Sequence, residues 1–328
     1  MSPPSPRVTV VIPNWNGLRH LPECLNALAA QSFTNFGVLL VDNASSDGSV
    51  AWVREHHPEV RVLQRPDNGG FAKAVNAGIL AARGEYVALL NNDTAVATGW
   101  LRALVAALDD HRDYGFAASK MILFCEPDRL NAAGDVYVLG RMAGKNRGFG
   151  EPVSRYGSME RVLGACAGAA LYRRAIFDEV GLFDEDFFLI GEDTDFNLRC
   201  LIAGQRCLYV PAAQVRHKYR ASIKTEPVWA MTRLAARNEA IVAVKDLPAE
   251  VLLLTPILWP YRFIRQTLLV RPSQWHVVST RLRQSPGRLR AEVEGARMGL
   301  AKRPDVWRLK AVGTPEILRW LLRGSGPA

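Results

Sequence analysis

Features typical of exported, disulfide-bonded or membrane-spanning proteins are missing from this chain of 328 residues. The first ten residues, MSPPSPRVTV, hold no apolar run of the kind that forms a signal peptide. The apolar segment 251–261 contains two prolines and falls short of the roughly 20 apolar residues that a spanning helix needs. The five cysteines are an odd number without paired Cys-x-x-Cys spacing. We therefore expect a protein of a reducing cytoplasm, with no structural zinc site and no transmembrane helix.

Acidic residues are scarce in the last third of the chain. Residues 216–328 hold 8 Asp and Glu against 21 Lys and Arg, a net charge of +13, whereas residues 1–215 hold 24 against 20, a net charge of −4. Such an asymmetry indicates contact with a polyanion, either an anionic lipid surface or nucleic acid, although an ordinary solvated basic face is the alternative.

Aromatic residues and leucines are interleaved with arginines in the same region. Around Trp259 and Tyr261 they alternate with Arg262, Arg265 and Arg271, as in a helix that lies in a membrane interface. We therefore favour an anionic membrane surface over nucleic acid as the partner. The alternative is a helix packed on the body of the protein or on a second subunit, which would make a homo-oligomer through the C-terminal helices.

The first half of the chain alternates short β-branched runs with helical patterns. This alternation, in a chain that is 48% hydrophobic and 22% charged, predicts a globular α/β fold with parallel strands. In such sheets ligands bind beyond the carboxyl ends of the strands. The predicted strands are 8–13, 37–41, 60–64 and 85–90, and the predicted helices are 18–31, 49–57 and 71–82.

The following stretch, 114–172, is less regular. Its glycine-rich part, 140–150, is expected to be a mobile loop and a candidate lid. Further strands are predicted over 115–122, 132–138 and 166–172, helices near Arg173 and Glu192, and a last core strand over 206–211.

Two polar clusters in the first half could meet a nucleotide. Asp42 directly follows an apolar strand and could accept hydrogen bonds from a nucleobase or ribose, although a purely structural turn is the alternative. Gly69 opens a helix whose amide groups could face phosphate, with Asn68 before it and Lys73 one turn in. Its alternative is a tight turn that merely starts a helix.

A third cluster, Asn91-Asn92-Asp93, ends an apolar strand and delivers a carboxylate to the edge of the sheet. There a divalent ion could bridge Asp93 to a diphosphate, although Asp93 as a helix cap is the alternative. A neutral imidazole at His217 could complete the metal site, or His217 could be incidental in a basic loop.

Three acids crowd the first turn of the helix predicted near residue 192. Asp195 and Arg199 have i,i+4 spacing and are expected to pair on the helix surface. Glu192 and Asp193 remain as candidates for a general base, since removing a proton from a hydroxyl group needs a carboxylate within hydrogen-bond reach. Acids in a first turn also stabilise the helix dipole, which is the structural alternative.

Taken in order, six segments resemble the inverting glycosyltransferase family 2, particularly its bacterial rhamnosyltransferase-like branch. The resemblance covers roughly residues 7–245, and residues 237–248 resemble the helix that follows the catalytic domain in that branch. The segments are VTVVIPNWNG, VDNASSDGS, NGGFAKAVNAGI, LLNNDT, the long segment from GACAGAALYRR to RCLIAG, and VRHKYRAS.

The resemblance implies a GT-A type fold and specific roles for residues of this chain. It implies Asp93 on a divalent metal, either Mg²⁺ or Mn²⁺, with His217 beside the metal and diphosphate, and Asp193 as the catalytic base. The family's DXD element is present as Asn91-Asn92-Asp93, with only its last carboxylate kept. Residues 164–168 would form a small-residue wall beneath the acceptor sugar. The residues expected around the nucleotide sugar are Pro13, Asn14, Asp42, Asn68, Gly69, Lys73, Asn91 and Asn92.

The implied function is transfer of a sugar, first rhamnose from dTDP-rhamnose, to a hydroxyl of a glycan or lipid-linked glycan at the cytoplasmic face of a membrane. Residues 1–245 would form the catalytic domain and 246–328 a basic amphipathic helical region. The alternatives are a UDP-sugar-dependent transferase of the same fold and an inactive scaffold or binding protein. A nucleotidyltransferase is less compatible, because the segment after the first strand, PNWNGLRHLPE, supplies no phosphate loop rich in lysine and arginine.

Overall fold

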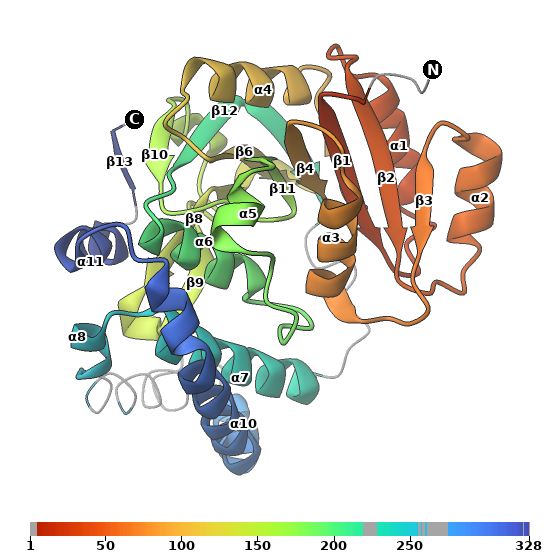
Figure 1. Ribbon diagram of the computed structural model, residues 1–328. Helices are drawn as coiled ribbons and strands as arrows, with labels where there is room; N and C mark the ends of the chain where they lie inside the picture. The colour runs from red at the N-terminus through yellow and green to blue at the C-terminus, as the bar shows by residue number, and fades with distance from the viewer. Residues whose placement is uncertain are drawn as a thin grey trace.

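The computed structural model describes residues 5–218, 228–254, 257, 260, 275–323 and 325–327. Within these residues an 11-stranded mixed sheet runs through the molecule, with helices on both of its faces (Figure 1). The strand order is β13-β10-β12-β6-β11-β4-β1-β2-β3, with β5 paired to β12 and β7 paired to β6.

The N-terminal part of the sheet is parallel, as the alternation of apolar runs and helices predicts. Strand β1 lies between β2 and β4, and three helices connect the strands in turn. The strands are β1 (Val8–Asn14), β2 (Phe36–Asp42), β3 (Arg61–Gln64) and β4 (Tyr86–Leu90), and the helices are α1 (Leu21–Ala29), α2 (Ser49–His56) and α3 (Gly70–Ala81). The buried Val8, Val10 and Ile12 face one layer of the core, while Val11 faces the other.

The middle of the chain turns the sheet from parallel to mixed, because β11 runs antiparallel to both β4 and β6. The elements are β5 (Thr94–Val96), α4 (Trp100–Asp110), β6 (Phe116–Leu123), β7 (Glu126–Ala133), β8 (Asp135–Val138), η1 (Leu139–Arg141), β9 (Ala143–Asn146), η2 (Val153–Arg155), β10 (Glu160–Val162), β11 (Ala169–Arg173), α5 (Ile176–Val180), α6 (Glu192–Ile202) and β12 (Cys207–His217).

Two expectations for this region are wrong in detail. Gly134, with φ at +82°, interrupts the strand predicted over 132–138 and separates β7 from β8. The glycine-rich stretch 140–150 is not an open loop, because β9 pairs with β8 in a hairpin that η1 connects. A Cβ on Gly144 of this hairpin would lie 2.0 Å from the hydroxyl of Thr194, so the hairpin packs closely against α6.

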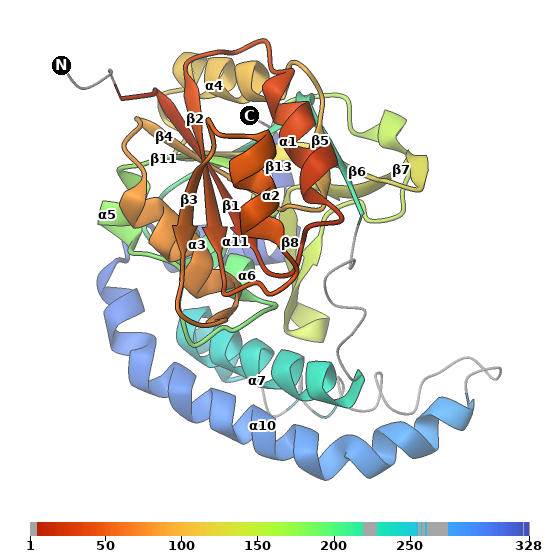
Figure 2. The ribbon, with the colours of Figure 1, turned by 90° about the vertical axis from the view of Figure 1, so that its right-hand side faces the viewer.

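The C-terminal region is helical and returns to the sheet. Its longest helix, α10, lies along α7 (Figure 2), and the approach is close because a Cβ on Gly295 would stand 2.1 Å from the carbonyl oxygen of Arg237. β13 pairs antiparallel with β10, so the segment predicted as the last core strand is followed by another. The elements are α7 (Val228–Asp246), α8 (Ala249–Leu252), α10 (Trp275–Arg308), α11 (Thr314–Arg323) and β13 (Ser325–Pro327).

In the part of the chain that the structure describes, none of the helices is both long and apolar enough to cross a bilayer. The predicted interfacial segment, with Trp259 and its neighbouring arginines, lies almost wholly outside the described residues.

Candidate active site

Three of the predicted nucleotide residues meet at the carboxyl edge of the parallel strands. Asn14 ends β1 beside Asp42, which ends β2, and the Asn14 side-chain amide donates to Asp42 Oδ1 at 3.1 Å. Asn92, two residues after β4, donates to Asn14 Oδ1 at 2.7 Å. All three side chains are buried, and Pro13 precedes Asn14 in β1. Hydrogen bonding therefore gives these polar groups defined orientations at the edge where a ligand is expected.

The turns after β1 and β2 contact this cluster. The Ser45 amide donates to Asp42 Oδ2 at 3.0 Å, and the Ser45 hydroxyl accepts from the Asn16 amide at 2.9 Å. A Cβ on Gly17 would stand 2.1 Å from the Asn92 side chain, so only glycine allows the chain to pass so close.

Asp93 and His217 lie side by side, as predicted, although they come from segments 124 positions apart. β5 pairs with β12 so that Thr94 lies opposite His217, and His217 Nε2 stands 3.2 Å from Asp93 Oδ1. His217 is the last residue of β12 rather than part of a loop. Its Nδ1 lies 2.8 Å from Asn131 Oδ1 of β7, where only an N–H can be the donor. Nε2 can hydrogen-bond to Asp93 Oδ1 only as an N–H donor, so a metal ion held between the two would take the place of that proton on the Nε2 lone pair.

The pair fits one side of a divalent-metal site. A carboxylate and a neutral imidazole nitrogen are metal ligands, and a hydrogen bond from the other ring nitrogen is the usual support of a ligating histidine. Burial alone would raise the pKa of Asp93, but the hydrogen bond and charge of His217 outweigh it and the pKa is lowered. Within the described residues no group of three or more His, Cys, Asp or Glu side chains could enclose a metal, so diphosphate oxygens and water would have to complete the coordination.

Basic side chains border this pair and were not singled out from the sequence. The Lys218 amide donates to the Asp93 carbonyl at 3.0 Å, and its Nζ lies 2.6 Å from Glu23 Oε2 and 3.5 Å from His20 Nδ1. Burial, followed by the charge of Lys218, lowers the pKa of His20. Only the basic composition after β12 could have indicated this neighbourhood.

The start of α3 is organised differently from the expected phosphate cradle. The first amides of α3 already have protein acceptors. The Gly70 amide donates to Asn68 Oδ1 at 3.1 Å, and the Phe71 amide donates to the Phe188 carbonyl at 2.8 Å. Gly70 has φ at +85°, and its missing Cβ would stand 2.3 Å from that same carbonyl. A phosphate here would compete with both acceptors, and the involvement of Asn68, Gly69 and Lys73 stays a prediction.

The three acids in the first turn of α6 have different surroundings. Burial, followed by the charge of Asp193, raises the pKa of Glu192 to about 8, and Glu192 Oε2 is buried without a hydrogen-bond partner. Burial also raises the pKa of Asp193, although the Thr194 amide donates to Oδ1 at 2.7 Å and opposes the rise. Asp193 is therefore the hydrogen-bonded member of the pair and Glu192 the desolvated one.

The backbone segment that contains Ala167 lies between α6 and the Asn91-Asn92-Asp93 segment. The next residue, Gly168, accepts a hydrogen bond from the Asn91 amide at 2.8 Å, and a Cβ on Gly168 would stand 2.9 Å from the Asn91 side chain. Helix α6, which carries Asp193, bonds Ala165 through Asn197 and is thus joined through residues 165–168 to the Asn91-Asn92-Asp93 segment. The expected small-residue wall is the element that makes this connection.

Two polar residues near Asp193 were missed by sequence reasoning. Asp135 of β8 is buried, its Oδ2 accepts from the Asn197 side chain at 3.3 Å, and its Oδ1 has no hydrogen-bond partner. Burial and the charge of Asp193 raise the pKa of Asp135 well above its ordinary range. The Asn197 amide also binds both backbone groups of Ala165, and Gly164 leaves the space that Asn197 occupies.

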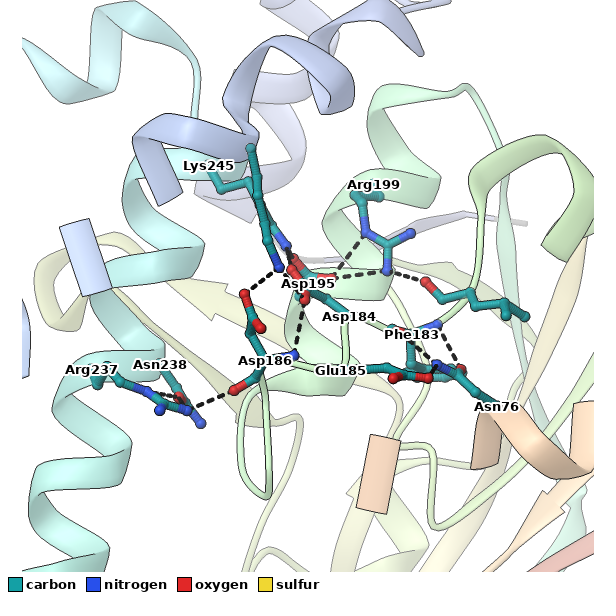
Figure 3. A network of polar contacts seen from close by, with 12 residues as sticks. Asn76, Phe183, Asp184, Glu185, Asp186, Asp195, Arg199, Arg237, Asn238 and Lys245 are labelled. Carbon is teal, nitrogen blue, oxygen red and sulfur yellow. Dashed lines mark hydrogen bonds and ion pairs between the residues drawn. The ribbon is translucent and has the colours of Figure 1, made fainter. Parts of the chain in front are cut away.

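The predicted pairing of Asp195 with Arg199 is present, at 2.9 Å, but its predicted place on the helix surface is wrong. Both side chains are buried, and Lys245 of α7 also pairs with Asp195 (Figure 3). Burial would raise the pKa of Asp195, but the charges of Lys245 and Arg199 outweigh it and the pKa is lowered. Asp195 is therefore a structural anion and leaves the catalytic candidates at Glu192 and Asp193.

The turn that enters α6 is strained. Ile190, a β-branched residue, has φ at +71°, and Gly191 follows with φ at +93°. A non-glycine residue in this region costs on the order of 1–3 kcal/mol and persists only where its surroundings enforce it. Here the side-chain amide of Asn238 in α7 donates to the carbonyls of Leu189 and Ile190, at 3.0 and 2.7 Å.

Comparison with known proteins gives consistent matches. The sequence profile of glycosyl transferase family 2 matches residues 9–181. A pre-mycofactocin glycosyltransferase of Mycobacterium tuberculosis is 31% identical over 232 residues, which are 68% of this chain and 45% of that protein. An N-acetylglucosaminyl-diphospho-decaprenol L-rhamnosyltransferase of the same species is 31% identical over 251 residues, which are 67% of this chain and 78% of that protein. The chain thus spans about half the length of the first relative and most of the second.

Solved structures share the fold at low sequence identity. GalNAc-T7 with UDP, GalNAc and Mn²⁺ has a TM-score of 0.61 at 18% identity, over 86% of this chain and 55% of that one. The mannosyltransferase PcManGT from Pyrobaculum calidifontis, in complex with GDP-Man and Mn²⁺, has a TM-score of 0.53 at 18% identity, over 97% and 88%. These likenesses confirm the predicted GT-A type fold.

Proposed function

The chain belongs to glycosyl transferase family 2, and we propose that it inverts the anomeric centre of a nucleotide-bound sugar while moving that sugar to an acceptor hydroxyl. One observation carries this proposal: Asn197, one turn after Asp193 in α6, bonds both backbone groups of Ala165, and the Gly168 carbonyl accepts from the Asn91 amide. The helix of the candidate base and the strand end of the candidate metal ligand thus contact the same backbone segment. Such an arrangement suits a reaction in which the acceptor attacks one face of a sugar and the diphosphate leaves from the other.

Asp193 is our candidate for the general base. It would accept the proton of the acceptor hydroxyl as that oxygen attacks the anomeric carbon, and no covalent intermediate is required. The raised pKa of its carboxyl, caused by burial, brings the group closer to the working pH of a base. Glu192 has an unpartnered oxygen and a pKa of about 8, so it would be largely protonated at neutral pH and serves as the alternative base only above that.

Asp93 and His217 are our candidates for holding a divalent ion, Mg²⁺ or Mn²⁺. When bound, such an ion would offset the negative charge that develops on the leaving diphosphate. Asp93 would supply a charged oxygen, and His217 a neutral nitrogen that Asn131 orients. Asn14, Asp42 and Asn92 would bind the nucleotide part of the donor from the adjoining strand ends.

The donor and acceptor are proposed from the relatives. A rhamnosyltransferase that is named for a decaprenol-linked acceptor matches 67% of this chain, which supports rhamnose from dTDP-rhamnose and a lipid-linked glycan. A lipid-linked acceptor would bring the enzyme to a membrane surface. We accordingly propose that the basic C-terminal region attaches it at the cytoplasmic face, with the exposed Leu253, Leu254 and Ile257 near the contact.

The test is a panel of nucleotide sugars, each with Mn²⁺ and with EDTA. We expect dTDP-rhamnose to stabilise the protein thermally and to be slowly hydrolysed with release of dTDP, only in the presence of metal. A preference for a UDP sugar would change the proposed donor but would leave the proposed reaction unchanged. Absence of binding and hydrolysis with every donor would contradict the proposed function and favour an inactive scaffold.

A further inference from the structure

The loop that carries the candidate base into the site is held from outside the catalytic sheet. It runs from Phe183 to the start of α6 at Glu192. On its sheet side the Asn76 side chain of α3 makes two hydrogen bonds with the backbone of Phe183, at 2.8 and 3.0 Å. Its other side faces the C-terminal helices, as Figure 3 shows.

A single ammonium group closes this loop at both ends. Lys245, near the end of α7, pairs with Asp184 Oδ2 at 2.5 Å and also with Asp195 in the first turn of α6. Asp184 precedes Glu192 and Asp193, and Asp195 follows them. Because Lys245 is 2% exposed, the two pairs are shielded from solvent, and their attraction is less screened than that of surface pairs.

The middle of the loop is held by the same helix. Asn238 satisfies the carbonyls of Leu189 and Ile190, where the backbone is strained, and Arg237 donates to the Asp186 carbonyl at 2.7 Å. Asn is a poor helix former in a helix interior, so its presence in α7 has a local reason in these contacts. The strained turn is enforced from α7 rather than from α6 itself.

Helix α10 supports α7 in this task and also touches the loop. Lys302 pairs with Asp184 Oδ1 at 2.6 Å and with Asp186, while the Trp307 indole donates to the Lys245 carbonyl at 3.0 Å. Arg303 donates to two carbonyls at the C-terminal end of α7. The loop, α7 and α10 thus form one connected polar network.

We propose that Asn238, Lys245 and Lys302 are positioning residues that fix the loop before α6, so that the C-terminal helices are a working part of the active site. The proposal rests on the proposed role of Asp193. It assigns to the region after residue 245 a task other than membrane attachment. Displacement of a reacting group by about 1 Å can cost about 10²-fold in rate, so loss of these contacts should act on turnover.

The experiment uses the full chain and four variants that keep α7 and α10. Asn238→Ala removes the support of the strained turn, and Lys302→Gln removes two ion pairs of a half-exposed side chain, so the fold should survive. Lys302→Arg keeps the charge and serves as the rescue. Arg308→Gln is the matched control, because Arg308 is also a basic residue of α10, but its side chain pairs with Asp305 of the same helix rather than with the loop.

Two readouts are measured for each protein: hydrogen exchange of the amides of residues 185–191, and kcat and donor KM for sugar transfer. We expect Asn238→Ala to speed exchange in this segment and lower kcat about 10–100-fold, and Lys302→Gln to lower kcat about 5–20-fold. Donor KM should change less than about threefold. Lys302→Arg should recover most of the rate, and Arg308→Gln should match the wild type.

Unchanged exchange in 185–191 for both loss variants would overturn the proposal, as would faster exchange with an unaltered kcat. A uniform rise in KM without a fall in kcat would also contradict it, since donor binding would then be the affected step. If the wild type transfers no sugar at all, the proposed function fails. The exchange data would still decide whether α7 and α10 hold the loop.

Discussion

Two carboxylates, the buried Asp93 and the half-buried Asp193, lie in regions of opposite electrostatic character. Asp93 faces His217, with His20 nearby, and its pKa is lowered although burial opposes this. Asp193 lies beside Glu192 and Asp135, and burial raises its pKa. Desolvation disfavours the charged form of both carboxylates, and the outcomes differ because basic neighbours outweigh it at Asp93, whereas it prevails at Asp193.

The difference suits two different tasks. A group that holds a cation and opposes a diphosphate has to stay charged, whereas a group that removes a proton has to be able to receive one. Acid and base assignments in an active site follow from such separated environments. Substitutions that change one carboxylate, or one of its neighbours, at a time should separate the two tasks.

The largest effect is expected at the acidic region. Asp193→Asn keeps the shape of the side chain but removes its ability to accept a proton, so kcat should fall about 10²–10⁴-fold. The rate of sugar transfer under saturating donor is the measurement. Glu192→Gln is the matched control, and a larger loss there than in Asp193→Asn would reassign the base to Glu192.

A loss of turnover almost as large is expected from changes in the basic region around Asp93, where activity should also depend on metal. Asp93→Ala and addition of EDTA should each lower turnover by about 10²-fold or more, since charge on the diphosphate would no longer be offset. A titration of activity with Mn²⁺ checks this, and His217→Ala should shift that titration to higher concentration. Full activity in EDTA would remove the metal from the account.

A smaller effect is expected from the residue behind His217. Asn131→Ala removes the acceptor of the Nδ1 hydrogen bond, so the imidazole loses its fixed tautomer and orientation. Changes of this kind cost about 10–100-fold in metal affinity. The Mn²⁺ concentration for half-maximal activity is the measurement, and an unchanged value would show that His217 needs no such support.

Protein stability should also depend on pH through Glu192 in the acidic region. The pKa of Glu192 is raised to about 8, above the ordinary value of 4.5. The folded state therefore retains a proton that the unfolded state releases, and stability should be lost as the pH rises from about 4.5 to 8. Glu192→Gln should remove this loss and raise the free energy of unfolding at pH 8 by about 1–3 kcal/mol, with less change at pH 5. Chemical denaturation at the two pH values is the measurement, and equal effects would contradict the shift.

The smallest effect per residue is expected at the basic surface. Each Lys or Arg near an anionic bilayer contributes about 1 kcal/mol, so the chain should sediment with anionic vesicles at low salt and poorly with neutral ones. The binding should weaken as salt screens the attraction. Equal sedimentation with both kinds of vesicle, or with neither, would contradict the membrane proposal.

Much of the donor side of the fold and site could be predicted, because the information there is local. Apolar runs predict β1, β2 and β4, and a polar residue directly after a run lies at the edge of the sheet. Asn14, Asp42 and Asn92 follow this pattern and meet as expected. Asp93 and His217 also meet, but that expectation came from the resemblance rather than from spacing.

The surroundings of Asp193 could not be predicted in the same way, because their contacts join distant segments. Asp195 and Arg199 read as a surface pair, and their burial depends on Lys245, 50 positions further on. Asp135 gave no local signal, since its environment is made by β8 and α6 together. Asn238 and Lys245 lie in a helix that also buries Ile241, and polar residues within such an apolar stretch are the signal that could have found them.

The separate tasks of the two carboxylates can be distinguished by calorimetry. Donor in Mn²⁺ buffer is titrated into the wild type, Asp93→Ala and Asp193→Asn. The account predicts that Asp193→Asn binds the donor within about threefold of the wild type, because its loss concerns only the proton. Asp93→Ala should bind at least about tenfold more weakly and should no longer respond to replacing Mn²⁺ with EDTA. Equal donor affinity in Asp93→Ala and the wild type, or loss of donor binding in Asp193→Asn, would contradict the account.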